Sequence, residues 1–200
     1  MNMIRTRASA PVGMHVPRSQ TLLWAGATGT VWRVQRGAFR LERAVGDALV
    51  VVHLALPGDL LGAEVLCDKP YSCSASAVVD SQAVPEPIFG NTARDAALRT
   101  ALLQHQRQAY DMVQLRNGPV SARVGHLVHL LTRFQADAGL SPERKQLPPL
   151  RDMAQIVDAA PETVCRELKR LMPELARTYR PRAHRTAFDR AVDSPVALTC

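Results

Sequence analysis

The chain of 200 residues lacks the long apolar runs that would place it in a membrane or a secretory pathway. No run approaches the roughly 20 apolar residues that a membrane-spanning helix needs, so we expect no membrane partner. The polar start, MNMIRTRASAPVGMHVPRSQ, has early arginines but no apolar core after them, which argues against a secretory leader. We therefore expect a cytoplasmic protein.

Cysteine is scarce and follows no metal-binding or disulfide pattern. The four cysteines stand at positions 67, 73, 165 and 200 without a CxxC pair, so we expect no disulfide framework and no zinc site. Cys67 and Cys73 flank one turn and have two interpretations, a redox pair or two small buried thiols, of which the second is favoured. We expect no cofactor and no catalytic residue. A metal enzyme of the cupin type would need histidine and carboxylate ligands clustered on strands. The predicted strand region, residues 21–90, has only His53 as a histidine.

Charge is unbalanced but moderate. The formal net charge is +7 and the pI is about 9.8, which is compatible with an anionic partner without identifying one. The length suits one sizeable domain or two small ones.

The first 90 residues change character once. Residues 1–20 are polar and without period, and we expect a flexible arm. Over residues 21–90, short apolar or alternating runs lie between turn signals, which predicts the strands of a jelly-roll β-sandwich. The runs are TVWRVQ, AFRLERAV, ALVVVHLAL, LLGAEVL and SCSASAVV.

Residues 91–118 predict one long helix, because no proline or glycine interrupts them before Gly118. Such a helix would be roughly 39 Å long, more than a small domain covers by itself. One interpretation is a helix lying across the β-domain. The favoured interpretation is a dimerisation helix that pairs with its copy through Leu98, Leu102, Ala109 and Met112.

The segment VSARVGHLVHLLTRFQADAG predicts a further amphipathic helix. Its expected buried face consists of Val124, Leu127, Val128, Leu131 and Phe134. His126 and His129 are three residues apart, and we expect them to be partly exposed helix residues rather than metal ligands.

The segment LRDMAQIVDAAPETVCRELKRL, Leu150 to Leu171, predicts two short helices joined by a turn at residues 158–160. Pro161 suits the first position of the second helix, where an N–H is unpaired in any case. Glu162, Cys165, Arg166 and Lys169 would face outward, where arginine can donate to guanine and glutamate can accept from cytosine. The alternative is an ordinary helical hairpin with a solvated basic face, and these residues alone do not decide between the two.

Two motifs in this order resemble the CRP/FNR regulators. APETVCRELKRL is similar to the recognition helix of that family, and LALPGDLLGAEVL resembles its P-G-D segment in the β-roll. The resemblance implies an α+β fold: an N-terminal jelly roll like a cyclic-nucleotide-binding domain, a long dimerisation helix, and a C-terminal winged helix-turn-helix over residues 119–190, followed by a tail at 191–200. It also implies a homodimer on a palindromic site in double-stranded DNA, with RNA polymerase as a further partner.

By this resemblance, Glu162 and Arg166 would read bases. The remaining DNA-binding residues would be Thr163, Cys165, Lys169, Arg170, Arg180 and Arg182. The candidate ligand pocket would contain Gly62, Glu64, Tyr71 and Ser72.

The chain departs from the family pattern at the turn and beyond it. Asp158 stands where glycine is usual, although aspartate tolerates positive φ better than most residues. Ala160 stands where a serine or threonine cap is common, and Pro161 replaces an arginine of some members. Past Met172 the residues show no clear hairpin alternation, which puts the wing in doubt.

The sequence also departs from the family's cyclic-nucleotide site. No arginine occurs between Arg43 and Arg94, and Tyr71-Ser72 stands where an arginine would hold the phosphate. No cysteine precedes Cys67, which excludes an iron–sulfur site with four thiolates near the N-terminus. We expect a regulator that works without a cyclic nucleotide. The alternatives are a regulator gated by a cyclic nucleotide or another small molecule, and a protein-interaction module whose basic tail binds DNA non-specifically.

Overall fold

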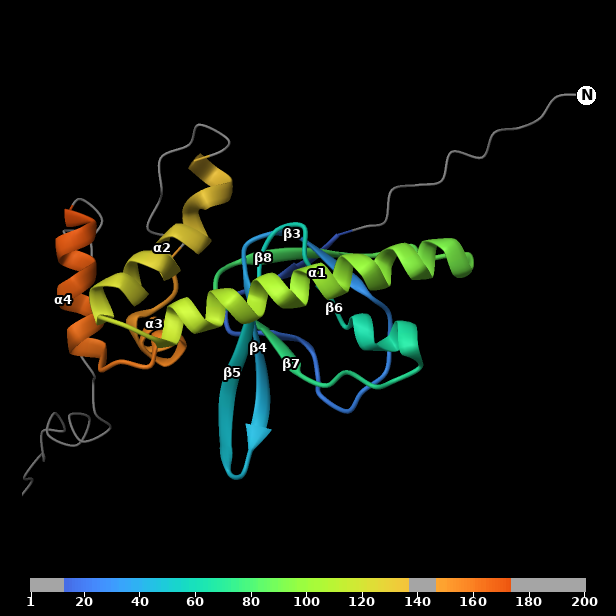
Figure 1. The fold of residues 1–200 in the computed structure, drawn as a ribbon, viewed down its shortest axis with the longest axis horizontal. Coiled ribbons are helices and arrows are strands. Elements are labelled where there is room, and N and C mark those ends of the chain that lie inside the picture. The colour runs from blue at the N-terminus through green and yellow to red at the C-terminus, as the bar shows by residue number, and fades with distance from the viewer. Residues whose placement is uncertain (1–12, 137–146, 174–200) are drawn as a thin grey trace, which may run out of the picture.

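The computed structural model describes residues 13–136 and 147–173, with the side chains of residues 134–136 left out. Eight strands come first and four α-helices follow (Figure 1). The elements are β1 Met14–Val16, β2 Thr21–Leu23, β3 Trp32–Arg36, β4 Phe39–Val45, β5 Ala48–Ala55, β6 Leu60–Leu61, the 3₁₀ helix η1 Ala63–Cys67, β7 Ser74–Ala77, β8 Ser81–Pro85, α1 Gly90–Arg116, α2 Val120–Ala136, α3 Leu150–Val157 and α4 Pro161–Leu171.

The strands form two antiparallel sheets, which confirms the expected α+β class. Their strand orders are β1-β8-β3-β6 and β2-β7-β4-β5. Fully buried side chains such as Val34, Phe39, Leu61 and Ala77 form one hydrophobic cluster that draws on strands of both sheets. We call the two sheets, residues 14–85, the β-roll. The hairpin of β4 and β5 projects from it (Figure 1).

The β-roll begins earlier than the sequence predicted. Strand β1 pairs with β8 from Met14 to Val16, so the flexible arm cannot extend to residue 20. The polar composition hid this strand because only Val16 of its three residues is buried. Strand β8 was also not predicted, since SQAVP lacks the alternating apolar pattern of the other runs.

The predicted strand LLGAEVL is wrong after its first two residues. Gly62 has φ 72°, in the left-handed region, and a Cβ at this position would lie 2.3 Å from the ring of Tyr71. The chain therefore leaves the sheet at this glycine. It continues as η1, which buries Leu66.

Helix α1 has 27 residues and lies along the β-roll, about 40 Å from end to end. Leu98 packs beside Leu60 and Leu66 of the β-roll, and Met112 packs against a second cluster of the same chain. Leu102 and Ala109 are exposed. Of the four residues predicted to pair two copies, two therefore already pack within the chain.

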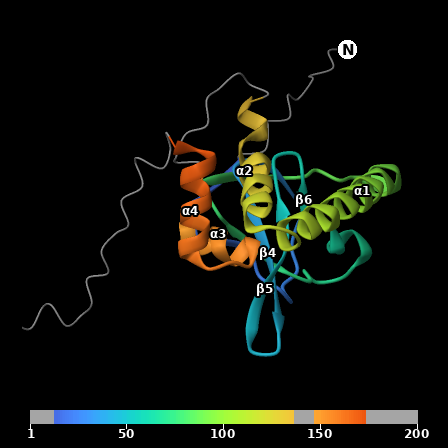
Figure 2. The same ribbon diagram turned by 60° about the vertical axis from the view of Figure 1, so that its left-hand side comes forward.

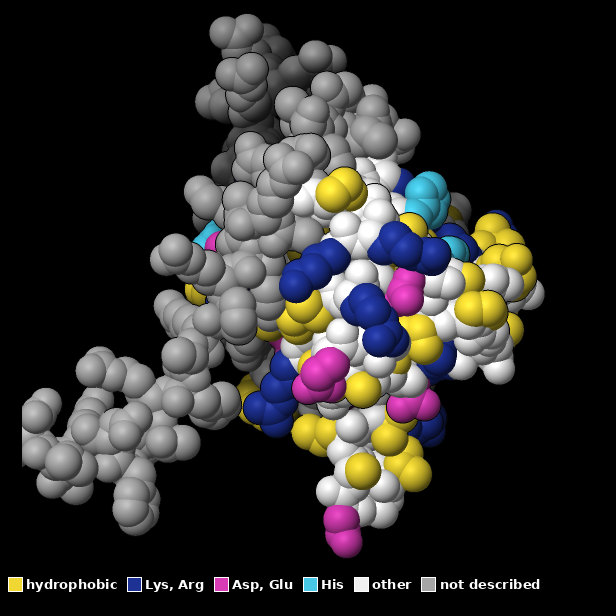
Figure 3. All heavy atoms as spheres, turned by 90° about the vertical axis from the view of Figure 1, so that its left-hand side faces the viewer, with side chains coloured by type: hydrophobic (Ala, Val, Ile, Leu, Met, Phe, Trp, Pro, Cys, Tyr) yellow, Lys and Arg dark blue, Asp and Glu magenta, His cyan; other side chains and the backbone are white. Residues whose placement is uncertain are grey.

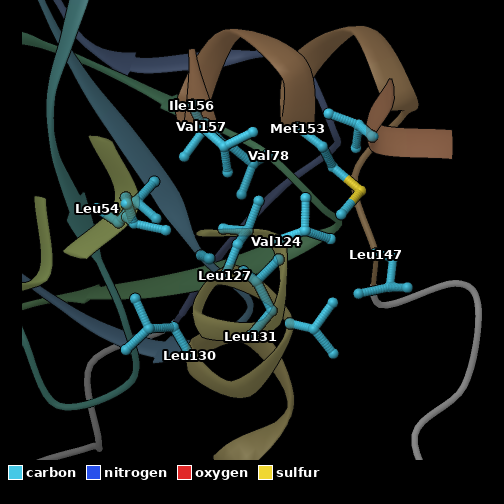
Figure 4. Close-up of a cluster of buried hydrophobic side chains, with 14 of the residues drawn as sticks. Leu54, Val78, Val124, Leu127, Leu130, Leu131, Leu147, Met153, Ile156 and Val157 are labelled. Atoms are coloured by element: carbon cyan, nitrogen blue, oxygen red, sulfur yellow. The ribbon is translucent and has the colours of Figure 1, made fainter. Parts of the chain in front are cut away.

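Residues of the C-terminal helices share one hydrophobic cluster with residues of the β-roll. The predicted buried residues of α2, Val124, Leu127, Val128 and Leu131, are all buried, while the side chain of Phe134 lies outside the described residues. They pack with α3, α4 and strand residues such as Leu54 and Val78 (Figure 4). Figures 1 and 2 show the resulting cluster of α2, α3 and α4 at one end of α1.

No helix among residues 13–136 and 147–173 is long and apolar enough to cross a membrane.

Candidate functional site

The turn between α3 and α4 has the backbone geometry expected from the sequence. Asp158 adopts φ 50°, the left-handed conformation for which glycine is common, and the N–H of Ala159 donates to the carbonyl of Ala154 at 3.0 Å. Pro161 occupies the first turn of α4, and the preceding Ala160 makes no side-chain cap. The turn therefore forms in spite of both departures, because aspartate tolerates this φ and the proline needs no N–H partner.

Helix α4 has a buried face and an open face. Val164 and Leu168 are buried in the shared core. Glu162, Arg166, Lys169 and Arg170 are exposed, and Thr163 and Cys165 are half-buried. Figure 3 views the end of the molecule that carries these helices, where Lys and Arg side chains lie with a few carboxylates between them.

The open face of α4 carries a hydrogen-bond acceptor and a hydrogen-bond donor one helical turn apart. Glu162 and Arg166 are four residues apart and so lie one turn apart on the same side of the helix. Arg170 also forms an ion pair with Glu167 at 3.2 Å, which leaves Arg166 and Lys169 as the cations of α4 with no ion pair in the described part of the chain. Arg180, Arg182 and the segment where a wing would follow lie outside the described residues.

A second candidate site is a cavity of about 500 Å³ between the β-roll and α1. Three of the four predicted pocket residues, Gly62, Glu64 and Ser72, line it. Tyr71 does not: it is buried between the sheets, where its hydroxyl donates to the carbonyl of Thr30 at 2.8 Å. The tyrosine fills the space beside Gly62, so its role is packing.

Glu64 gives this cavity a negative end. Its Oε1 accepts hydrogen bonds from both the backbone N–H of Ser72, at 3.2 Å, and the Ser72 hydroxyl. Burial, and then the charge of Glu64, raise the pKa of Tyr71, so the phenol stays neutral. A phosphate bound at this end of the cavity would lie beside the Glu64 carboxylate, and Arg43 is the arginine that lines the cavity.

Two imidazoles also line the cavity, and the sequence did not predict that they would meet. His53 of β5 and His105 of α1 lie edge to face with ring centroids 4.9 Å apart. Burial lowers the pKa of His53, and the neighbouring His105 lowers it further. No signal in the sequence could pair them, because they are on elements separated by β6, η1, β7 and β8.

We expect His53 to make the folded protein sensitive to acid. Well above about pH 6.5 the His53 imidazole is neutral in the folded and in the unfolded chain. At lower pH the unfolded chain binds a proton at His53 more readily than the folded chain does. Folding stability should therefore fall as the pH is lowered from about 7.5 to about 5.5, and should fall less in His53→Gln. Urea unfolding at both pH values measures this, with exposed His15→Gln as the matched control. An equal loss in His53→Gln and wild type would contradict it.

A buried carboxylate explains the structural use of the P-G-D motif. Asp59 accepts from the backbone N–H of Leu56 at 2.9 Å and from Arg107 of α1 at 2.6 Å. On the same helix, Asp111 pairs with His126 of α2 at 3.2 Å. The motif therefore joins the β-roll to α1, and His126 is occupied in linking α1 to α2.

Within the described part of the chain, no three His, Cys, Asp or Glu side chains come together in a way that could hold a metal ion. Cys67 is exposed and Cys73 is half-buried, and both are free thiols. The interpretation as two small buried thiols is therefore wrong, because Cys67 is exposed and Cys73 is only half-buried.

Known proteins with related sequences and folds are transcriptional regulators. The transcriptional regulator LdrP of Thermus thermophilus is 30% identical over 134 residues, which span 64% of this chain and 66% of the relative. The match thus falls just short of two thirds of that relative's length. No protein-family model matches the chain.

Solved structures support the same grouping. A transcriptional regulator of the CRP family from Thermus thermophilus is 25% identical with a TM-score of 0.58, over 80% of this chain and 85% of that one. FixK2 from Bradyrhizobium japonicum shares the fold, with 20% identity and a TM-score of 0.60 over 81% of this chain and 84% of that one.

Proposed function

We propose that this chain is a transcriptional regulator of the CRP/FNR family and that it binds a palindromic promoter site in double-stranded DNA as a homodimer. The observation that carries the proposal is the open face of α4. Its cations and Glu162 point outward while its apolar side is held in the core, as a helix that enters a major groove requires. We place this activity in the cytoplasm, with RNA polymerase as the partner that responds, and we propose no enzymatic activity.

We assign base reading to Arg166 and Glu162. The guanidinium can donate twice to a guanine, and the carboxylate can accept from a cytosine of a neighbouring pair. Thr163, Cys165, Lys169 and Arg170 would contact the surrounding backbone or bases. Helix α3 and α4, joined at Asp158, would thereby act as a helix-turn-helix.

We assign dimerisation to the side of α1 that faces away from the β-roll. Leu102, Tyr110 and Val113 are 60%, 62% and 54% exposed, and Leu103 and Ala109 are exposed beside them. Large apolar side chains gathered on one exposed helix side favour burial against a partner. A second copy of α1 supplies the same surface, which suits a two-fold interface.

Cyclic AMP and cyclic GMP are expected not to bind at physiological concentrations. Tyr71, which stands where the resemblance would put a phosphate-binding arginine, is buried in the core, and the neighbouring Ser72 donates to the Glu64 carboxylate. The arginine of the lining, Arg43, is exposed, and a solvated arginine offsets little of the cost of desolvating a phosphate beside an acid. Isothermal calorimetry of the wild-type protein with each nucleotide measures this, and a micromolar dissociation constant for either one would overturn the assignment.

The cavity favours one second candidate, a regulator gated by a small molecule other than a cyclic nucleotide. Its volume of about 500 Å³ and its mixed lining of imidazole, carboxylate and aliphatic groups suit a small organic ligand. Affinity for the selected DNA, measured with and without small molecules extracted from cells, separates the two candidates.

Selection of bound duplexes from random DNA tests the proposed function. A dimeric regulator should enrich an inverted repeat whose half-sites lie about two helical turns apart. A protein-interaction module with a non-specific basic tail should enrich no repeat. Its affinity for DNA should change with salt concentration but not with DNA sequence.

A further inference from the structure

Helix α3 is tied to the β-roll by an arginine shared between two carboxylates. Arg40 of β4 donates from Nη1 to Oδ1 of Asp152 in α3 at 3.1 Å, and its Nε lies 3.1 Å from a carboxylate oxygen of Glu42. The three side chains are only 19%, 17% and 7% exposed for Arg40, Asp152 and Glu42. Pairs so far removed from water are weakly screened, and breaking one of them leaves a buried charge without its partner.

A second arginine ties the same helix to α1. Arg116, the last residue of α1, donates to the carbonyl of Ile156 at 2.8 Å and approaches that of Gln155 at 3.4 Å, both near the end of α3. It also donates to the carbonyl of Val51 in β5 at 3.3 Å. A cation at the C-terminal end of a helix is favoured by the helix dipole. One guanidinium therefore joins α1, α3 and the β-roll.

Apolar side chains near Arg40 and Arg116 also pack α3 and α4 against the β-roll. Val51, Leu54 and Val78 of the β-roll share one core with α3 and α4 (Figure 4). Ile156 and Val157, beside the carbonyl that Arg116 binds, have no exposed surface. Packed cores of this kind resist continuous deformation. The packing therefore favours one position and orientation of α3 against the β-roll.

We propose that Arg40, Asp152 and Arg116 are positioning residues that hold α3, and through it the reading helix α4, in one orientation that is competent for DNA. The proposal rests on the proposed function, because orientation matters only if α4 enters DNA.

The open face of α4 supports the proposal that the held orientation is competent, because its proposed base-reading side chains are exposed. Arg40 and Arg116 act on α3, whereas Glu162, Arg166 and Lys169 of α4 remain exposed. A device that blocks DNA would cover those side chains, and here the β-roll contacts the buried side of the helical cluster instead.

Asp152→Asn is the first test, because positioning and bulk charge predict opposite results. Removing a negative charge from a DNA-binding unit should by itself strengthen binding to any duplex. Loss of the Arg40 contact should instead weaken binding to the selected duplex about 10-fold, with little change on a scrambled one. The variant should also lose its preference for one half-site spacing, since α4 is no longer held in one orientation.

Arg116→Lys is the second test, because it keeps the charge. Lysine offers a single point donor group and cannot match the planar fork that reaches three carbonyls. We expect the same pattern: about 10-fold weaker binding to the selected duplex, unchanged binding to the scrambled duplex, and tolerance of half-sites moved by one base pair. Arg36→Lys makes the same change at an exposed arginine of β3, so it is the matched control and should keep the spacing preference of the wild type.

Fluorescence anisotropy on selected, scrambled and respaced duplexes separates the outcomes. If the wild-type protein does not distinguish selected from scrambled DNA, the proposed function itself fails. If the wild type does distinguish them, but Asp152→Asn and Arg116→Lys keep its affinity and its spacing preference, the positioning role is overturned. Circular dichroism checks folding, and Arg116→Lys decides the matter should Asp152→Asn be unfolded.

Discussion

Replacing Arg166 with alanine is expected to weaken binding to the selected duplex by about 1–3 kcal/mol for each half-site and to blur the preference for one guanine. Arg166 is exposed on α4, one turn from Glu162, and points away from the core that holds Val164 and Leu168. Its two donors can match the two acceptors of guanine in the major groove. Competition anisotropy with duplexes that vary one base pair at a time measures both effects.

Lys169→Ala provides the matched control on the same helix face. We expect Lys169 to contact phosphate, so its replacement by alanine should lower affinity for selected and scrambled duplexes alike and make the salt dependence of binding shallower. If Arg166→Ala behaves like Lys169→Ala, losing the same affinity on both duplexes, then Arg166 contacts phosphate and α4 does not read bases through it.

Replacing both Leu102 and Val113 with glutamate is expected to produce monomers and to lower affinity for the full palindrome by about 100-fold or more, since two linked half-sites gain that much over one. Both side chains are more than half exposed on the free side of α1. Glutamate keeps the helix intact, so repulsion between two copies is the intended effect. Light scattering gives the mass, and anisotropy gives the affinity for full and half sites.

Leu49→Glu is the control for adding charge at an exposed leucine. It lies in the hairpin of β4 and β5, 62% exposed and away from α1. This variant should remain dimeric and bind normally. A dimeric Leu102→Glu/Val113→Glu protein would show that the free side of α1 is not the interface.

The β-roll region was largely predictable from the sequence because sheet strands have a local signature. Runs such as ALVVVHLAL alternate or cluster apolar residues between turn residues, and β5 follows that run. The prediction failed where the signature is weak: β1 has one buried residue, and Gly62 takes the chain out of the sheet after Leu61. Short strands depend on their neighbours for hydrogen bonds more than on their own residues.

The helical half was predictable for the same local reason, down to the turn. The i, i+4, i+7 spacing of Val164, Leu168 and Leu171 predicts the inward side of α4. Val164 and Leu168 are buried, but Leu171, the last residue of the helix, is 43% exposed, so that part of the prediction is wrong. Asp158 adopts the positive φ that aspartate tolerates. Outward placement of Glu162, Arg166 and Lys169 follows from those two apolar residues alone.

The sequence by itself therefore determined the helix and strand types and the open face of α4, because these depend on residues within one or two turns of each other. Only the tertiary structure decided what α1 packs against, that Tyr71 belongs to the core, and that His53 meets His105. It also decided that Arg40 reaches Asp152 across 112 residues of chain. Such contacts form between elements that are brought together by burial of a shared core, and no local spacing encodes them.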